Sequence, residues 1–295
     1  MNKQLRGSLL LLLATVIWGS AFIAQSVGME HIGPFTFQAI RCLLAVLFLF
    51  PLSFLPDMGK TDAKSSLRKW LDPQLWKAGI ICGLALFVAA SLQQVGLIYT
   101  DAGKAGFITA MYIVLVPILG IFRKQKPSAS IIISVILAVV GLYLLSCLNA
   151  HGINKGDLLV MGCALAFAVQ ITCIDMLGLQ LDGLRLNCVQ ALVVCVLSLP
   201  FMLLTETVEP ASIAACWLPL GFAGILSMGV AYTLQIQGQK DLEPTTASLI
   251  MSLESVFAAL GGWLILKETM VFHELLGCIL VFAAVLLSQL PPRKK

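Results

Sequence analysis

Ten stretches of continuous apolar sequence follow one another along the chain, separated by short polar segments. They fall at roughly 8–28, 35–55, 77–98, 104–121, 129–148, 156–177, 183–204, 216–235, 244–266 and 270–290. Because the apolar residues do not alternate with polar ones, they indicate helices and not the strands of a barrel. Each stretch is close to the length of about 20 residues with which a helix crosses a bilayer. The pattern predicts an all-α polytopic membrane protein with ten transmembrane helices.

The composition excludes a soluble globule. Of the 295 residues, 59% are hydrophobic and only 12% are charged, which is about half the charge of an ordinary soluble domain. So few ionic side chains would not cover a water-exposed surface. The first span follows Lys3 and Arg6 as a signal peptide would, but its apolar run is too long and no small-residue cleavage site follows. We therefore expect a retained first helix.

Basic residues are unevenly distributed among the connecting segments. With the N-terminus inside, fifteen of the 19 Lys and Arg lie in inner segments, three lie in outer segments, and Arg41 lies within a span. The inner residues are Lys3, Arg6, Lys60, Lys64, Arg68, Lys69, Lys77, Arg123, Lys124, Lys126, Arg185, Lys240, Arg293, Lys294 and Lys295, and the outer ones are Lys104, Lys155 and Lys267. Such a bias marks the cytoplasmic side, so both termini are expected there, as in a bacterial inner-membrane protein. The net charge of +4 needs no nucleic-acid partner.

Weak self-similarity relates the two halves of the chain. At a spacing of 149 residues, Gly7 aligns with Gly156, Leu43 with Leu192 and Pro51 with Pro200; at a spacing of 141, Trp76 aligns with Trp217, Gly83 with Gly224 and Gln94 with Gln235. The order of these matches predicts two repeats of five spans each, residues 1–149 and 150–295. Because five is odd, the second repeat enters the membrane from the opposite side. Transporters use such inverted repeats to open a central site to each side in turn.

Five segments carry a family resemblance, namely residues 18–22, 37–45, 105–117, 253–257 and 267–268. On these segments, and over nearly its whole length, the chain resembles the ten-helix EamA family of the drug/metabolite transporter superfamily. The resemblance implies a central cavity lined by spans 1, 3, 4, 6, 8 and 9, and export of amino acids or related small metabolites. One departure is Ser255, where the family often has proline. Pro117 keeps the proline in the first half, so a bend in the ninth span is in doubt.

Charged residues at membrane depth are candidate functional groups, because a charge near the bilayer centre costs at least ~2.5–3.5 kcal/mol. Glu254 lies near the middle of the ninth span; it could carry a proton, bind a substrate amine, or simply pair with a neighbouring helix. Arg41 lies six residues into the second span and could snorkel to the outer surface or attract a carboxylate. Asp175, Lys104 and Glu268 lie at span ends and are expected at the membrane interface.

Amide and aromatic side chains form a second group of candidates. An amide in hydrocarbon needs a hydrogen-bond partner, so some amides should pair across helices while others line a cavity walled by aromatic rings. On the spans that the resemblance implies lie Trp18, Gln94, Tyr112, Gln170, Tyr232, Gln235 and Glu254. With Arg41, these residues are the predicted substrate-binding or coupling candidates.

Several function classes lack their sequence signals. No P-loop, GxGxxG, HExxH or GxSxG motif is present, so we expect no enzyme, no ATP hydrolysis and no cofactor. The nine cysteines form no CxxC pair and are expected to pack as small hydrophobes, without a metal. The sequence favours a secondary or facilitative transporter of a small metabolite, with protons as a possible partner. The alternatives are an antiporter for phosphorylated or nucleotide sugars, which would need several cations in the cavity, and a membrane-embedded enzyme or sensor.

Overall fold

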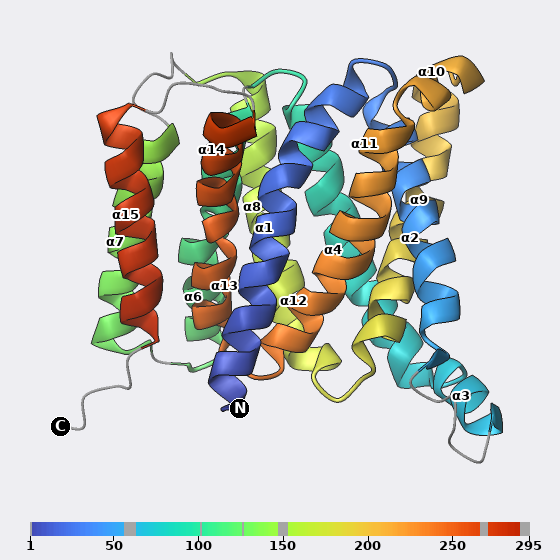
Figure 1. Ribbon diagram of the computed structural model, residues 1–295. Helices are drawn as coiled ribbons and strands as arrows, with labels where there is room; N and C mark the ends of the chain where they lie inside the picture. The colour runs from blue at the N-terminus through green and yellow to red at the C-terminus, as the bar shows by residue number, and fades with distance from the viewer. Residues whose placement is uncertain are drawn as a thin grey trace.

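The computed structural model describes residues 2–55, 63–100, 102–125, 127–146, 153–265 and 271–289, and all regular structure in them is helical. The helices stand side by side in one bundle (Figure 1). Seven of them are long and apolar enough to cross a membrane, namely Lys3–Met29, Pro34–Leu52, Pro73–Gly96, Lys104–Phe122, Lys155–Gly178, Gly183–Thr205 and Trp217–Gln239. Shorter apolar helices cover Ala129–Leu145, Pro244–Leu260 and Phe272–Ser288. The prediction of an all-α polytopic membrane protein is confirmed.

The elements follow the predicted stretches closely. They are α1 (Lys3–Met29), α2 (Pro34–Leu52), α3 (Ala63–Trp70), α4 (Pro73–Gly96), α5 (Ala102–Ala110), α6 (Tyr112–Phe122), α7 (Ala129–Ser146), α8 (Lys155–Cys173) with the π-helical η2 (Ile174–Gly178), α9 (Gly183–Thr205), α10 (Pro210–Ala215), α11 (Trp217–Gly221) continued by the π-helical η3 (Phe222–Ala231) and α12 (Tyr232–Gln239), α13 (Pro244–Met251), α14 (Leu253–Ile265) and α15 (Phe272–Ser288). The short helices α3 and α10 were not predicted. They lie in connecting segments at opposite ends of the bundle (Figure 1).

Capping residues in the polar segments determine where several helices begin. The side chain of Asp72 accepts a hydrogen bond from the second residue of α4, and Asp182 does the same near the start of α9. At α8, Asn154 and Asp157 form a reciprocal capping box. These bonds satisfy backbone N–H groups that a helix start leaves unpaired, so polar residues flanking an apolar run set the ends of the spans.

Both the fourth and the ninth predicted spans contain a break. Helices α5 and α6 are separated at Met111, and α13 and α14 at Ser252. In the first case Pro117 lies inside α6 and lacks a backbone donor. In the second case no proline is present; instead the Ser252 hydroxyl donates to the carbonyl of Leu249 over 2.7 Å, a local bond that competes with the helix ladder. The ninth span is therefore broken even though Ser255 replaces the proline.

Close backbone crossings join the helices. A Cβ added to Gly277 of α15 would lie 2.5 Å from the carbonyl oxygen of Gly141 in α7. Likewise, a Cβ on Gly156 of α8 would lie 2.6 Å from the carbonyl oxygen of Gly96 in α4. Small residues at such crossings let helix backbones approach closely. In lipid, where the hydrophobic effect does not drive helices together, such close packing is a main source of helix association.

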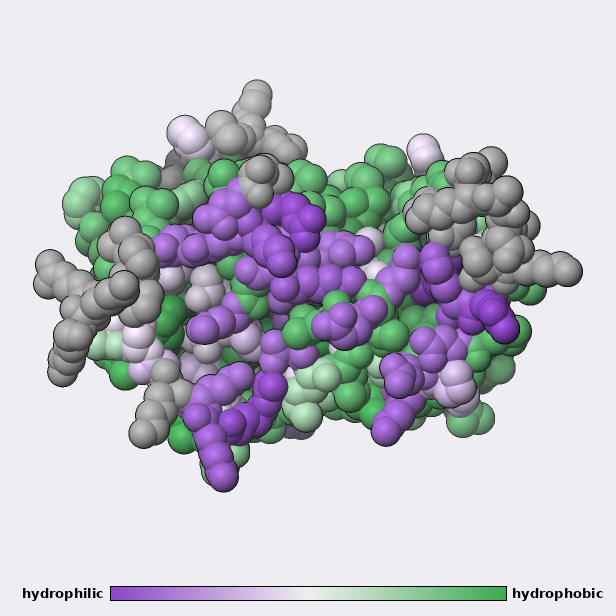
Figure 2. Space-filling view, turned by 90° about the horizontal axis from the view of Figure 1, so that it is seen from below, coloured by the Kyte–Doolittle hydropathy of each residue, from purple (hydrophilic) through white to green (hydrophobic). Residues whose placement is uncertain are grey.

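Helix α1 begins and helix α15 ends at the same end of the bundle, which we call the terminal face; the opposite end is the distal face (Figure 1). Seen from the terminal face, hydrophilic residues gather over its middle and apolar residues surround them (Figure 2). Large apolar side chains are exposed on the flanks, for example Leu47, Ile136 and Met161. Polar ends and apolar flanks are what a bilayer-spanning bundle requires.

Candidate functional site

A cavity lies inside the bundle among α1, α2, α4, α5, α6, α8, η3, α12, α13 and α14. The volume that the centre of a water molecule can occupy in this cavity is ≈ 50 Å³. That volume is enough for a few water molecules. Aromatic rings form part of the wall, and polar side chains form the rest. The aromatic residues are Trp18, Phe22, Tyr112, Phe167 and Tyr232; the polar ones include Gln25, Arg41, Gln93, Thr109, Gln235 and Glu254. The arrangement is a small polar chamber with aromatic walls.

The two helix breaks bring Tyr112 and Glu254 together. Tyr112 is the first residue of α6 and directly follows its break, and Glu254 is the second residue of α14, two positions after the break at Ser252. The Tyr112 hydroxyl donates to Oε1 of Glu254 over 3.2 Å, and both residues are buried. The carboxyl group also lies in the first turn of α14, where the helix dipole favours a negative charge. The two interruptions thus lie next to a buried polar contact inside the bundle.

Arg41 brings a cation into the same cavity. Its Nη1 donates to Oε1 of Gln25 over 2.7 Å, and its guanidinium lies 5.8 Å from the ring centre of Phe37. Only 7% of Arg41 is exposed, so the alternative that it snorkels to the surface is wrong. Its Nε is buried without a hydrogen-bond partner. Since Arg41 is on α2, the cavity includes the second span, which the resemblance did not imply.

The aromatic wall is built around Trp18. Its ring meets that of Tyr232 edge to face, with 5.0 Å between the ring centres. The indole Nε1 of Trp18 is buried and has no hydrogen-bond partner. The Oε1 atom of Gln235 is also buried and also has no hydrogen-bond partner. A cavity ligand could therefore accept a hydrogen bond from Trp18 and donate one to Gln235.

Six of the eight predicted candidates line the cavity, namely Trp18, Arg41, Tyr112, Tyr232, Gln235 and Glu254. Gln170 does not line it and lies behind Gln235, whose Nε2 donates to the Gln170 Oε1 over 3.2 Å. Gln94 is buried away from the cavity, and Gln93 takes that place, because neighbouring residues of a helix point about 100° apart. Helix periodicity could have selected Gln25 in advance, since it lies seven residues after Trp18 and shares its face.

Ion pairs occupy the span ends where Lys104 and Asp175 were expected at the interface. Lys104 Nζ lies 2.6 Å from Asp157, and Arg123 Nη1 lies 2.8 Å from Asp175. The first pair joins α5 to α8, and the second joins the residue that ends α6 to η2, so the pairs lie toward opposite ends of the bundle. Glu268 is outside the described residues. Among the described lining residues of the cavity, Arg41 is the one basic residue and Glu254 the one acidic residue.

Comparison with known proteins adds four findings. The sequence model of the EamA-like transporter family matches residues 5–147 and again 154–290. An uncharacterized transporter of Archaeoglobus fulgidus is 32% identical over 98% of this chain and 87% of its own length. The threonine/homoserine exporter RhtA of Escherichia coli K12 is 26% identical over 97% of this chain and 92% of its own length. A crystal structure of a protein with 16% identity superposes with a TM-score of 0.81 over 97% of both chains, which is a likeness of fold.

Proposed function

The chain belongs to the EamA-like transporter family, and we propose that it exports a small metabolite of the amino-acid type by secondary or facilitative transport. The observation that carries the proposal is that the guanidinium of Arg41 and the carboxyl group of Glu254, which can carry opposite charges, line one buried cavity. A protein interior holds an isolated charge only at high cost, so these charges need partners inside the bundle. A zwitterionic substrate supplies both partners at once.

The cavity groups suggest how such a substrate would bind. The substrate carboxylate would face the guanidinium of Arg41, whose Nε has no protein partner, and the ammonium would face Glu254. The side chain would lie against Trp18 and Tyr232. The relative RhtA is named an exporter of threonine and homoserine, which supports this class. A phosphorylated sugar would need several cations, and the described lining offers one.

We take all ten apolar helical regions as membrane spans, arranged as two inverted five-span repeats, residues 1–149 and 150–295. The double match of the family model supports this division. So does a pair of similar crossings, in which Gly156 packs against Gly96 while Gly7 packs against Gly238. The breaks at Met111 and Ser252 add a third correspondence between the halves.

Alternating access follows from that arrangement. The observed cavity holds only a few waters, so a metabolite requires the halves to rock apart on one side. On the terminal face, opening would break the two hydrogen bonds that Arg6 donates to Asp241. Toward the distal face, it would break the hydrogen bond that Lys104 donates to Asp157. The excess of Lys and Arg in the segments predicted to lie inside supports cytoplasmic termini in a bacterial inner membrane.

A substrate panel in proteoliposomes tests the zwitterion proposal. For each amino acid, the panel would include its N-acetyl derivative, which lacks the ammonium, and its decarboxylated amine. Losing a charge-assisted hydrogen bond costs about 1.5–3 kcal/mol, so Arg41→Gln should raise the half-saturating concentration of the amino acid roughly tenfold to hundredfold. The amine should be affected little. Lys155→Gln, at an exposed position, is the matched control. Equal transport of all three compounds by the wild type would refute the proposal.

Proton coupling through Glu254 is tested in the same vesicles. We expect addition of substrate to the wild type to change the internal pH. In Glu254→Gln this change should disappear, because an amide cannot carry the proton. Unchanged flux and unchanged proton dependence in Glu254→Gln would exclude that role. An efflux screen in cells overexpressing the chain would identify the substrate.

A further inference from the structure

The short helix α3 lies at the terminal face, to the side of the long helices and beyond the end of α2 (Figure 1). It covers Ala63–Trp70 and is followed almost at once by α4, which begins at Pro73. Its chain neighbours on both sides are therefore ends of apolar helices. With α2 and α4 taken as membrane spans, as proposed above, a helix between their ends would lie at the level of the headgroups.

Three faces can be distinguished on α3, because successive residues are about 100° apart. Ser66 and Trp70 share the face toward the bundle: Ser66 is buried, and the Trp70 indole Nε1 donates to Oγ of Ser53. Leu67 and Leu71 share the next face and are 59% and 73% exposed. Arg68 lies on a third face and is exposed. The helix is thus amphipathic, with its exposed apolar stripe beside a basic one.

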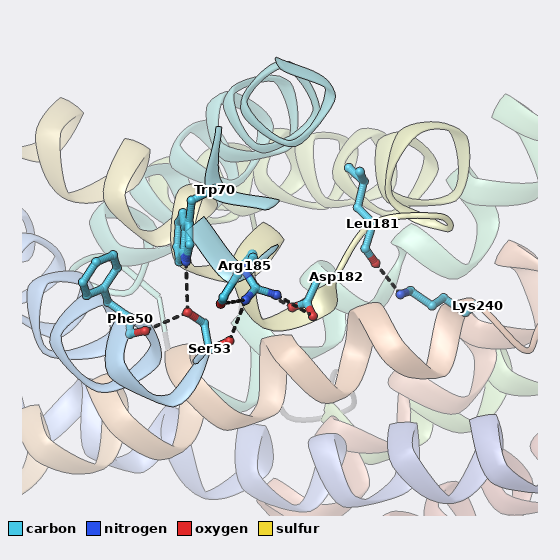
Figure 3. Close-up of polar contacts among 8 residues, drawn as sticks. Phe50, Ser53, Trp70, Leu181, Asp182, Arg185 and Lys240 are labelled. Atoms are coloured by element: carbon cyan, nitrogen blue, oxygen red, sulfur yellow. Dashed lines mark hydrogen bonds and ion pairs between the residues drawn. The ribbon is translucent and has the colours of Figure 1, made fainter. Parts of the chain in front are cut away.

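A fully buried arginine holds α3 to the spans (Figure 3). Nη2 of Arg185 in α9 donates over 2.8 Å both to the carbonyl of Ser53, at the end of α2, and to the hydroxyl of Ser66 in α3. Its Nη1 donates to Asp182 over 3.1 Å. A buried charge is retained where such bonds satisfy it, so α3, α2 and α9 form one fixed unit.

The surroundings of the exposed leucines show which partner fits them. Phe50 near the end of α2 and Trp76 near the start of α4 are also exposed, by 49% and 38%. Aromatic residues at span ends are typical of the membrane interface. Lys77 follows Trp76 and is exposed. Apolar residues together with cations at the end of a membrane-spanning bundle are complementary to anionic phospholipids.

We propose that α3 and the start of α4 form a docking surface for anionic phospholipid of the leaflet at the terminal face. Leu67 and Leu71 enter the boundary between headgroups and acyl chains, and Arg68 and Lys77 bind headgroup phosphates. Through Arg185 the docked helix holds the end of α2, the helix that also carries Arg41.

Spin labels on the full-length protein test the docking. Nitroxides would be attached singly to Leu67→Cys, Leu71→Cys and Arg68→Cys in vesicles containing phosphatidylglycerol, and the signal of the labelled parent protein would be subtracted. The ratio of oxygen to water-soluble nickel accessibility should be higher at 67 and 71 than at 68, since oxygen partitions into lipid. If all three positions are equally accessible to nickel, α3 lies in water and the proposal is wrong.

Lipid selectivity tests the role of the basic residues. Association of spin-labelled phosphatidylglycerol, relative to phosphatidylcholine, would be compared among wild type, Arg68→Gln/Lys77→Gln and the distal-face control Lys155→Gln. A basic residue near an anionic surface contributes about 1 kcal/mol, which corresponds to a factor of about five. We expect the preference at this surface to fall up to about fivefold per charge in the double variant, and less in the control. Equal preference in all three proteins would overturn the proposal.

Discussion

Replacing Gly19 by alanine tests whether the crossing of α1 and α14 positions the site. A Cβ on Gly19 would lie 2.8 Å from the backbone nitrogen of Ala258, 2.8 Å from Cβ of Phe257 and 2.9 Å from the carbonyl oxygen of Glu254. Carbon atoms pack at roughly 3.5 Å, so these contacts are short by about 0.6–0.7 Å. None of these three neighbours is the far end of a flexible side chain, so the helices themselves must move apart.

Such a displacement has two measurable consequences. Overpacking of this kind costs about 1–3 kcal/mol, so Gly19→Ala should unfold at lower denaturant or temperature than the wild type. The shift would also lengthen the 3.2 Å contact between Tyr112 and Glu254 beyond hydrogen-bond range. We therefore expect transport per folded molecule in proteoliposomes to fall as well.

Gly221→Ala is the matched control, because a Cβ there would meet no atom within 4 Å. In a helix the change from glycine to alanine is otherwise favourable by up to about 1 kcal/mol, so this variant should be at least as stable as the wild type. If Gly19→Ala matches Gly221→Ala in both stability and transport, the two helices are not held at the distance that the structure shows, and the reasoning fails.

Two further substitutions test single contacts. Tyr112→Phe removes the hydrogen-bond donor to Glu254, so it should lower the free energy of unfolding by about 0.5–1.5 kcal/mol and slow transport. The control Tyr143→Phe, at a half-exposed side chain, should change neither. Equal transport rates in the two variants would show that the bond does not contribute to transport. At the distal face, the Glu206 carboxylate accepts from the backbone N–H and the hydroxyl of Thr36, each over 2.7 Å, and so caps α2. Glu206→Ala should lower the free energy of unfolding, measured by thermal unfolding, by about 0.5–2 kcal/mol. Glu206→Gln keeps an acceptor oxygen and should lose less stability. An equally large loss of stability in the glutamine variant would contradict a capping role.

The candidate site was partly predictable because burial of polar groups in hydrocarbon is costly wherever it occurs. Glu254 and Arg41 stood out in the sequence for that reason, and both line the cavity. The choice between Gln93 and Gln94 was not predictable, since it depends on the rotation of α4 about its axis. The role of Gln25 depends on the side chain of Arg41, which crosses from α2 to meet it.

Hydrophobicity summed over about 20 residues is a property of the local sequence, so the chain by itself determined that this is a helical membrane protein and where its apolar helices run. The distribution of Lys and Arg likewise indicated the orientation without any knowledge of packing. Only the tertiary structure decided which polar residues meet, because that depends on helix rotation, on the interruptions at Met111 and Ser252 and on contacts between distant segments. Arg185 illustrates the difference: its charge in a short connection looked like one more cytoplasmic marker, and folding buried it completely as the link between α9, α2 and α3.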